Sequence, residues 1–198
     1  MSQDPSVDGA TQDPDAALVV RLLRRDEPAF RALIARYRDR LYNVALRMLG
    51  DAAEAEDLTQ EVFITVFKRI DAFRGEAKLS TWLYRLTINH AKNRVKYLAR
   101  RHDRQHDQID DGHAALPAHG GASPDQLLER ARMDVRLEEA VRRLDEDQRL
   151  LVILRDVEEL SIEEIRQITG LVEGTIKSRL HRARLALRKH LEDYHEPT

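Results

Sequence analysis

The sequence of 198 residues contains no cysteine, and this excludes disulfide bonds, thiolate catalysis and cysteine-ligated zinc. Glycine (8) and proline (6) are few, and aromatic residues make up only 5% of the chain. The segments with apolar periodicity are almost free of glycine and proline. Because sheets favour aromatic and β-branched residues and need frequent turns, this composition predicts an all-α protein.

Long hydrophobic runs are also absent. The longest apolar runs are far too short to span a bilayer, and no segment has the layout of a signal peptide. We therefore expect a cytoplasmic protein without membrane insertion.

No excess of one charge marks the chain as a whole, since its net charge is -2 with 34% charged residues. Overall basicity therefore does not indicate a nucleic-acid partner. Charges of one sign are instead grouped along the chain, and this grouping is the more informative pattern.

The segment 160–188 has the pattern of a helix-turn-helix. Ser161 and Glu164 form a capping-box signature, and Gly170 is suited to end the short helix that follows. The next helix carries six Lys or Arg and no acid between residues 174 and 190, whereas residues 156–164 carry five acids and no base. A basic helix after a short helix and a glycine turn is typical of a reader of the DNA major groove. Four residues at helical spacing are expected to face inward: Ile176, Leu180, Ala183 and Leu187.

The rest of the chain divides into two helical domains and a linker. We predict a disordered segment at 1–14, a first domain at 15–101, an acidic flexible linker at 102–124 and a second domain at 125–192. Local signals predict helices at 15–25, 26–49, 51–70, 81–101, 125–144 and 145–157. Asp15, Ser80 and Asp145 are predicted N-caps, and Asp26 and Asp51 are predicted to start their helices.

The third predicted helix has an acidic face. Between residues 48 and 67 there are five acids and no base, and Asp57, Gln60 and Glu61 share one side of the helix. Phosphate would be repelled by this face, so a basic protein partner is the functional interpretation. An ordinary solvated face is equally compatible with the pattern.

The fourth predicted helix is basic, with seven Lys or Arg against one acid between residues 85 and 104. Asn89 and Asn93 lie among these bases, where lysine and arginine can neutralise phosphates and asparagine can read base edges. The preceding loop contains Arg74, Lys78, Ser80 and Thr81, which could line a pocket for an unstacked base. Trp82 and Tyr84 are better explained as core residues.

Three phrases in this order, DLTQEVF, FRGEAKLSTWLYR and GTIKSRLHRAR, resemble bacterial RNA polymerase sigma factors of the extracytoplasmic-function (ECF) class of the sigma-70 family. The resemblance covers about residues 15–100 and 125–190. It implies a protein that binds core RNA polymerase, recognises the -10 and -35 promoter elements and promotes DNA melting, so that a specific gene set is transcribed. It also implies no cofactor and an anti-sigma factor as a further partner.

The resemblance implies roles for particular residues. Those implied to bind core polymerase are Asp57, Gln60 and Glu61. Those implied for the -10 element are Lys78, Ser80, Thr81, Asn89, Lys92, Asn93 and Lys96. Those implied for the -35 element are Thr175, Lys177, Ser178, Arg179, His181 and Arg182.

Two alternatives remain. A polymerase-independent helix-turn-helix regulator would bind duplex DNA tightly by itself, at a palindromic site. An enzyme would need the histidines and aspartates of the linker, among them His102, His106 and His113, as metal ligands. Because no third ligand is fixed and no catalytic signature is found elsewhere, we expect neither a metal site nor an enzyme.

Overall fold

The structure, a computed structural model, describes residues 15–102 and 135–192. All regular structure in these two ranges is helical, which confirms the all-α class. The first domain comprises α1 (Ala16–Leu23), α2 (Glu27–Leu49), α3 (Ala52–Arg69), η1 (Ile70–Ala72) and α4 (Leu79–His102). The second comprises a helical segment at 135–142, α6 (Glu146–Val152), η2 (Ile153–Val157), α7 (Ile162–Thr169) and α8 (Glu173–Glu192).

Some predictions concern residues outside these ranges, namely the segment 1–14, nearly all of the linker at 102–124 and the first half of the helix at 125–144. Within the ranges that the structure describes, no helix is both long enough and apolar enough to cross a bilayer.

Local side-chain chemistry explains most of the helix boundaries. The carboxylate of Asp51 accepts a hydrogen bond from the backbone N–H of Glu54 (2.9 Å), and Asp145 accepts one from Gln148 (2.8 Å). Each bond satisfies one of the N–H groups that a helix start leaves unpaired. Gly50 ends α2 in the left-handed conformation (φ 76°), which glycine adopts without steric cost. These boundaries agree with the predicted ones.

Two predicted caps are wrong. Ser80 does not precede the fourth helix, because α4 already begins at Leu79. Asp15 does stand before α1, but its carboxylate makes no capping bond. It is buried and accepts hydrogen bonds from Arg36 and from the hydroxyl of Tyr37, both on α2. Asp15 therefore fastens α1 to α2.

An unusual turn connects α6 to the helix-turn-helix. Residues Ile153–Val157 form a π-helical turn, closed by the hydrogen bond from the N–H of Glu158 to the carbonyl of Ile153 (2.9 Å). A π turn takes one more residue than an α turn, so the residues after it are displaced around the helix axis.

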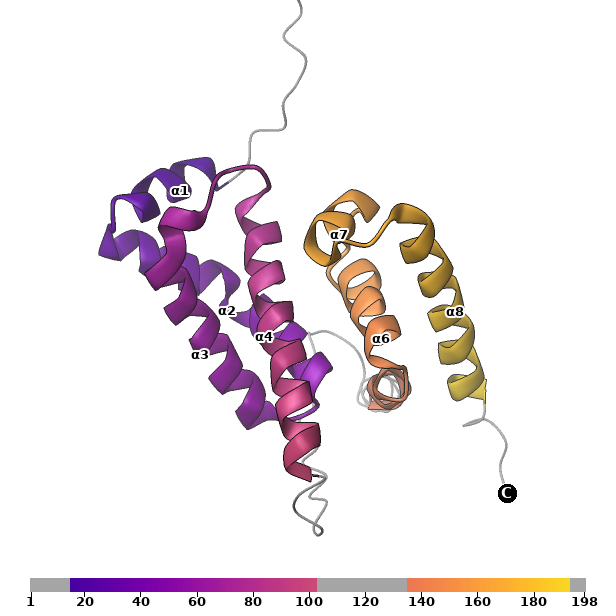
Figure 1. The fold of residues 1–198 in the computed structure, drawn as a ribbon. Coiled ribbons are helices and arrows are strands. Elements are labelled where there is room, and N and C mark those ends of the chain that lie inside the picture. The colour runs from indigo at the N-terminus through magenta and orange to yellow at the C-terminus, as the bar shows by residue number, and fades with distance from the viewer. Residues whose placement is uncertain (1–14, 103–134, 193–198) are drawn as a thin grey trace, which may run out of the picture.

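The apolar core continues from the first domain into the second. α2, α3 and α4 pack on one another, and α4 also packs against α7, so α4 lies between α3 and α7 in Figure 1. The largest core cluster contains Leu41, Leu58 and Leu83 from the first domain and Leu151 and Ile165 from the second, all fully buried. Burying one such side chain stabilises the fold by about 1.5–3 kcal/mol.

Arg149 adds a polar connection between the domains. Its guanidinium donates to the carbonyl of Met48 at the end of α2 (3.2 Å) and to that of Leu144 (3.1 Å). Burial lowers the pKa of this guanidinium from its usual value. The side chain thus joins the end of α2 to the turn that precedes α6.

The two glycines beside α7 and α8 allow a matched test of the helix-turn-helix. Gly170 has φ 72°, Gly174 lies in the first turn of α8, and a methyl group would meet no atom within 4 Å at either position. Gly170→Ala should therefore lower the free energy of unfolding by about 1–2 kcal/mol through backbone strain alone. Gly174→Ala should leave it unchanged or raise it by up to about 1 kcal/mol. Urea denaturation followed by circular dichroism measures both, and equal midpoints for the two variants would contradict the assigned turn.

Candidate nucleic-acid interface

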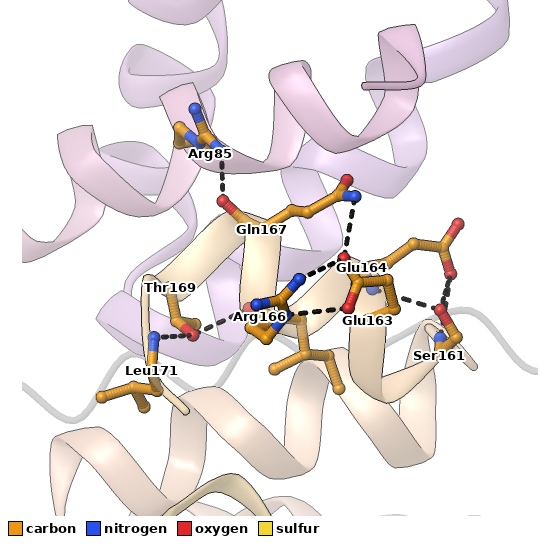
Figure 2. Close-up of polar contacts among 9 residues, drawn as sticks. Arg85, Ser161, Glu163, Glu164, Arg166, Gln167, Thr169 and Leu171 are labelled. Carbon is orange, nitrogen blue, oxygen red and sulfur yellow. Dashed lines mark hydrogen bonds and ion pairs between the residues drawn. The ribbon is translucent and has the colours of Figure 1, made fainter. Parts of the chain in front are cut away.

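The helix-turn-helix is formed by α7 and α8. The hydroxyl oxygen of Ser161 accepts a hydrogen bond from the backbone N–H of Glu164 (3.2 Å). In return the backbone N–H of Ser161 donates to the carboxylate of Glu164 (2.9 Å), which completes the predicted capping box (Figure 2). Gly170 ends α7, and α8 begins three residues later. The four residues of α8 predicted to face inward are all buried: Ile176, Leu180, Ala183 and Leu187. The predicted helix pair is therefore confirmed.

The outer face of α8 presents four of the six residues proposed for the -35 element. Lys177, Ser178, His181 and Arg182 are exposed. Thr175 and Arg179 are partly buried, and the carbonyl of Thr175 accepts a hydrogen bond from the hydroxyl of Ser178 (3.1 Å).

Carboxylates of α8 itself and of neighbouring elements pair with cations of this basic helix. Lys177 forms an ion pair with Glu173 one turn earlier, and its hydrogen bond lowers the pKa of the Glu173 carboxyl. Arg179 pairs with Asp147 of α6, and Arg184 pairs with Asp156 of η2. The hydrogen bond to Asp156 raises the pKa of Arg184. The acidic block at 156–164 signalled such partners, but sequence reasoning did not identify Asp147.

The outer face of α4 presents a second set. Asn89, Asn93 and Lys96 are exposed at intervals of four and three residues, and Lys92 on the same side is partly buried. The structure thus brings together the four residues of α4 that were proposed for the -10 element.

The loop before α4 faces the second domain. Lys78 forms an ion pair with Glu164 of α7 (2.8 Å), whereas Thr81 is buried, with 2% of its surface exposed. A cavity of about 450 Å³ lies between the loop and α7. Its lining includes Gly75, Lys78, Thr81, Glu163, Glu164 and Gln167.

Trp82 and Tyr84 of α4 belong to the core, as expected, whereas Tyr97 on the same helix is exposed. Trp82 packs on Phe73, with ring centroids 5.4 Å apart. Tyr84 is 2% exposed, and its hydroxyl donates to the carboxylate of Glu158 in the second domain. Burial and this hydrogen bond raise the pKa of Tyr84.

The acidic face of α3 is exposed at Asp57, Gln60 and Glu61. Glu61 accepts a hydrogen bond from Arg94 of α4 (2.7 Å), which also pairs with Glu54. Burial acts in the opposite direction, yet the hydrogen bond to Glu54 and the charge of Glu61 raise the pKa of Arg94. Glu61 is therefore partly neutralised by its own chain, while Asp57 makes no hydrogen bond or ion pair with the residues that the structure describes.

No group of three or more metal-ligating side chains is found among the described residues. The histidines and aspartates of the linker lie outside them, apart from His102 at the end of α4.

Comparison with known proteins agrees with this arrangement. Residues 33–111 match the family described as Sigma-70 region 2, and residues 134–187 match Sigma-70, region 4. The chain is 34% identical to the RNA polymerase sigma-H factor of Pseudomonas aeruginosa, over 92% of this chain and 96% of the relative. It is 32% identical to the ECF RNA polymerase sigma factor SigW of Bacillus subtilis, over 88% of this chain and 95% of the relative.

Solved structures show the same fold. The sigma factor RpoE from Bartonella quintana, in its co-crystal structure with the anti-sigma factor NepR, matches with a TM-score of 0.68 and 26% identity, over 82% of this chain and 96% of that chain. CnrH in complex with the cytosolic domain of CnrY matches with a TM-score of 0.67, over 92% of this chain and 99% of that chain. At 21% identity the second likeness concerns the fold alone.

The chain belongs to the sigma-70 family and, within it, to the ECF sigma factors. It is a promoter-recognising transcription initiation factor, and the family is non-catalytic.

Tyr84 provides a pH test of the contact between the two domains. Because its pKa is raised above the ordinary value near 10, the folded protein keeps a proton that the unfolded chain releases above that pH. The free energy of unfolding should therefore fall as pH rises above 10, by up to about 1.4 kcal/mol per pH unit more in the wild type than in Tyr84→Phe. Urea titrations at pH 8–11 measure this difference, and parallel curves would contradict the buried, hydrogen-bonded phenol.

Proposed function

We propose that the acidic face of α3 binds core RNA polymerase, while α4 with its preceding loop and α8 recognise the -10 and -35 elements. The observation that carries this proposal is the sign of charge on three exposed surfaces. The face of α3 is acidic, whereas those of α4 and α8 are basic. A protein that assembles with polymerase and DNA together needs surfaces of both kinds, and a regulator that binds DNA alone does not need the acidic one.

The three residues proposed for polymerase binding differ in availability. Asp57 and Gln60 are exposed beside the core positions Leu58 and Val62, whereas Glu61 already pairs with Arg94. We therefore assign the larger part of the polymerase contact to Asp57, with Gln60 beside it.

For the -10 element, one face of α4 would bind the promoter strand. Its lysines, Lys92 and Lys96, would neutralise phosphates, and its asparagines, Asn89 and Asn93, would read exposed base edges. Lys78 and Thr81 line the cavity that faces α7, and Ser80, which is partly buried, lies between them in the chain. A base taken out of the stack would need such a recess, because contacts there must offset a few kcal/mol of unstacking.

For the -35 element, α8 would enter the major groove with Lys177, Ser178, His181 and Arg182 toward the DNA. Thr175 and the N-terminus of α8 would favour a phosphate. Arg179 would take part once it leaves Asp147.

The remaining assignments follow from this function. We propose that the protein acts in the cytoplasm, where the polymerase works, and that it is not an enzyme and needs no cofactor. The co-crystal structure of RpoE with an anti-sigma factor supports an anti-sigma factor as a partner of this chain too.

Run-off transcription from genomic fragments tests the assignment of α3. With bacterial core polymerase, the protein should produce new start sites. Asp57→Ala should reduce these transcripts by roughly thirtyfold or more, because removing one partner of a buried charge pair at an interface costs about 2–5 kcal/mol. Glu56→Ala is the matched control, since Glu56 is an exposed acid of the same helix that pairs with Arg38 of α2 instead. No new start sites, together with tight binding of duplex DNA by the free protein, would favour the polymerase-independent regulator.

The salt dependence of promoter binding tests the assignment of α8. If Arg182 contacts a phosphate, Arg182→Gln should weaken binding of the holoenzyme at all promoters and reduce the slope of log K against log salt by about 0.9. Arg188→Gln serves as control, because Arg188 is exposed on the same helix but pairs with Glu192. Equal slopes for the two variants would refute a phosphate contact by Arg182.

A further inference from the structure

Four exposed cations lie at one end of the first domain, close to the loop that precedes α4: Arg24, Lys68, Arg69 and Arg74. Arg24 follows α1, Lys68 and Arg69 end α3, and Arg74 begins the loop. We call these four residues the basic corner. None of their side chains forms a hydrogen bond or an ion pair within the part of the chain that the structure describes.

Arg25 joins the end of α1 to the end of α3 and so assembles the basic corner. Its guanidinium donates to the main-chain carbonyl of Phe67 in α3, pairs with Asp71 of η1 and lies 5.7 Å from the centroid of the Phe67 ring. The loop is fixed beside them, because Phe73 packs on Trp82 of α4 with ring centroids 5.4 Å apart. Cations that are far apart in the sequence therefore lie at the same end of the domain (Figure 1).

The acids at this end of the domain do not neutralise the basic corner. Asp26 pairs with Arg21 (2.7 Å), and Asp71 pairs with Arg25. Glu76 of the loop lies in the lining of the cavity that faces α7. The basic corner thus carries a positive charge without a partner in its own domain, and such a surface attracts a polyanion.

The basic corner extends the DNA surface proposed for α4 to the other side of the cavity. Arg74 directly precedes Gly75, which lines the cavity, and Thr81 at the start of α4 lines it as well. From there α4, with Asn89 and Asn93, runs away from this end of the domain (Figure 1). A strand that lies along α4 with one base in the cavity would bring its next phosphates to the basic corner.

We propose that the basic corner binds phosphates of the promoter strand beyond the base that the cavity holds. The proposal rests on the function proposed above for α4 and its loop. The strand is then bound on both sides of the unstacked base, by α4 on one side and by the basic corner on the other. Since phosphate contacts carry no sequence information, the basic corner supports the opened strand equally at every promoter.

Arg24 and Arg69 are the residues of the basic corner that can be tested most selectively. Arg74 adjoins the cavity, and Lys68 lies two helical turns from Glu61 on the same side of α3, so their replacement would also affect base capture or polymerase binding. The test variant is therefore the double substitution Arg24→Gln, Arg69→Gln.

A matched control removes the same charge from exposed arginines outside the basic corner. Arg31 already pairs with Glu27, and Arg188 already pairs with Glu192. The control variant is therefore Arg31→Gln, Arg188→Gln, which changes the net charge equally.

The measurement is binding of the holoenzyme to fluorescein-labelled single-stranded DNA that carries a -10 element mapped by run-off transcription. One probe contains the element alone, and two others extend it by about eight nucleotides, the length that one strand-binding groove covers, on the 5′ or on the 3′ side. On one extended probe the test variant should bind about threefold to tenfold more weakly than the control, and its slope of log K against log salt should be smaller by about 1.4, or about 0.7 for each lost phosphate contact. On the unextended probe the two variants should bind equally.

Equal affinities of the test and control variants for all three probes would overturn the proposal. A loss of equal size on the unextended probe, or on both extended probes, would overturn it as well, because it would reflect general attraction of DNA. Weaker assembly of the test variant with core polymerase in the absence of DNA would show that the basic corner binds an acidic protein surface instead.

Run-off transcription by the wild type separates this proposal from the proposed function. New start sites, together with equal binding of the test and control variants, would overturn the DNA site at the basic corner alone. If the wild type directs no initiation, the proposed function fails, and binding of oligothymidine of about 16 nucleotides to the free full-length protein then decides. Equal affinities of the two variants for oligothymidine would overturn the basic corner too, whereas weaker binding by the test variant would retain it as a strand-binding surface.

Discussion

The packing of α4 between two groups of helices is the constraint on which the other surfaces depend. One side of α4 is buried against α2 and α3. Another side meets the second domain, where Tyr84 bonds to Glu158 and Arg85 bonds to Gln167 of α7. Only the remaining side, with Asn89 and Asn93, faces solvent. Because α4 packs on α2, α3 and α7, the apolar residues of α4 that stabilise the first domain also determine where the second domain packs.

Much of the fold follows from local chemistry, and that part could be predicted from the sequence. Asp51, Asp145 and the pair Ser161–Glu164 satisfy N–H groups within their own first turns, so their role depends on residues at most three positions away. Gly50 and Gly170 act through their own backbone angles. The burial of Ile176 and Leu180 follows from helical spacing alone. None of these features requires knowledge of how the helices pack.

The contacts between distant segments could not be predicted in the same way. The grouping of charges along the chain indicates that basic and acidic surfaces exist. It does not indicate that Arg94 pairs with both Glu54 and Glu61, or that Glu164 pairs with Lys78. Asp15 stands at the position of an N-cap, yet its carboxylate accepts a hydrogen bond from the hydroxyl of Tyr37, 22 residues further along the chain. In each case an ion pair or hydrogen bond available only after packing prevails over the local preference.

The π-helical turn at Ile153–Val157 determines the directions of the acids around it. Asp156 inside the turn meets Arg184 of α8, whereas Glu158 just after it meets Tyr84 of α4, so two acids two residues apart serve opposite sides of the second domain. Deleting one residue here would restore an ordinary α-helical turn and rotate Glu158 away from its partner. The number of residues in this turn is therefore a structural requirement. A substitution leaves that number unchanged, whereas an insertion or deletion alters it and displaces Glu158.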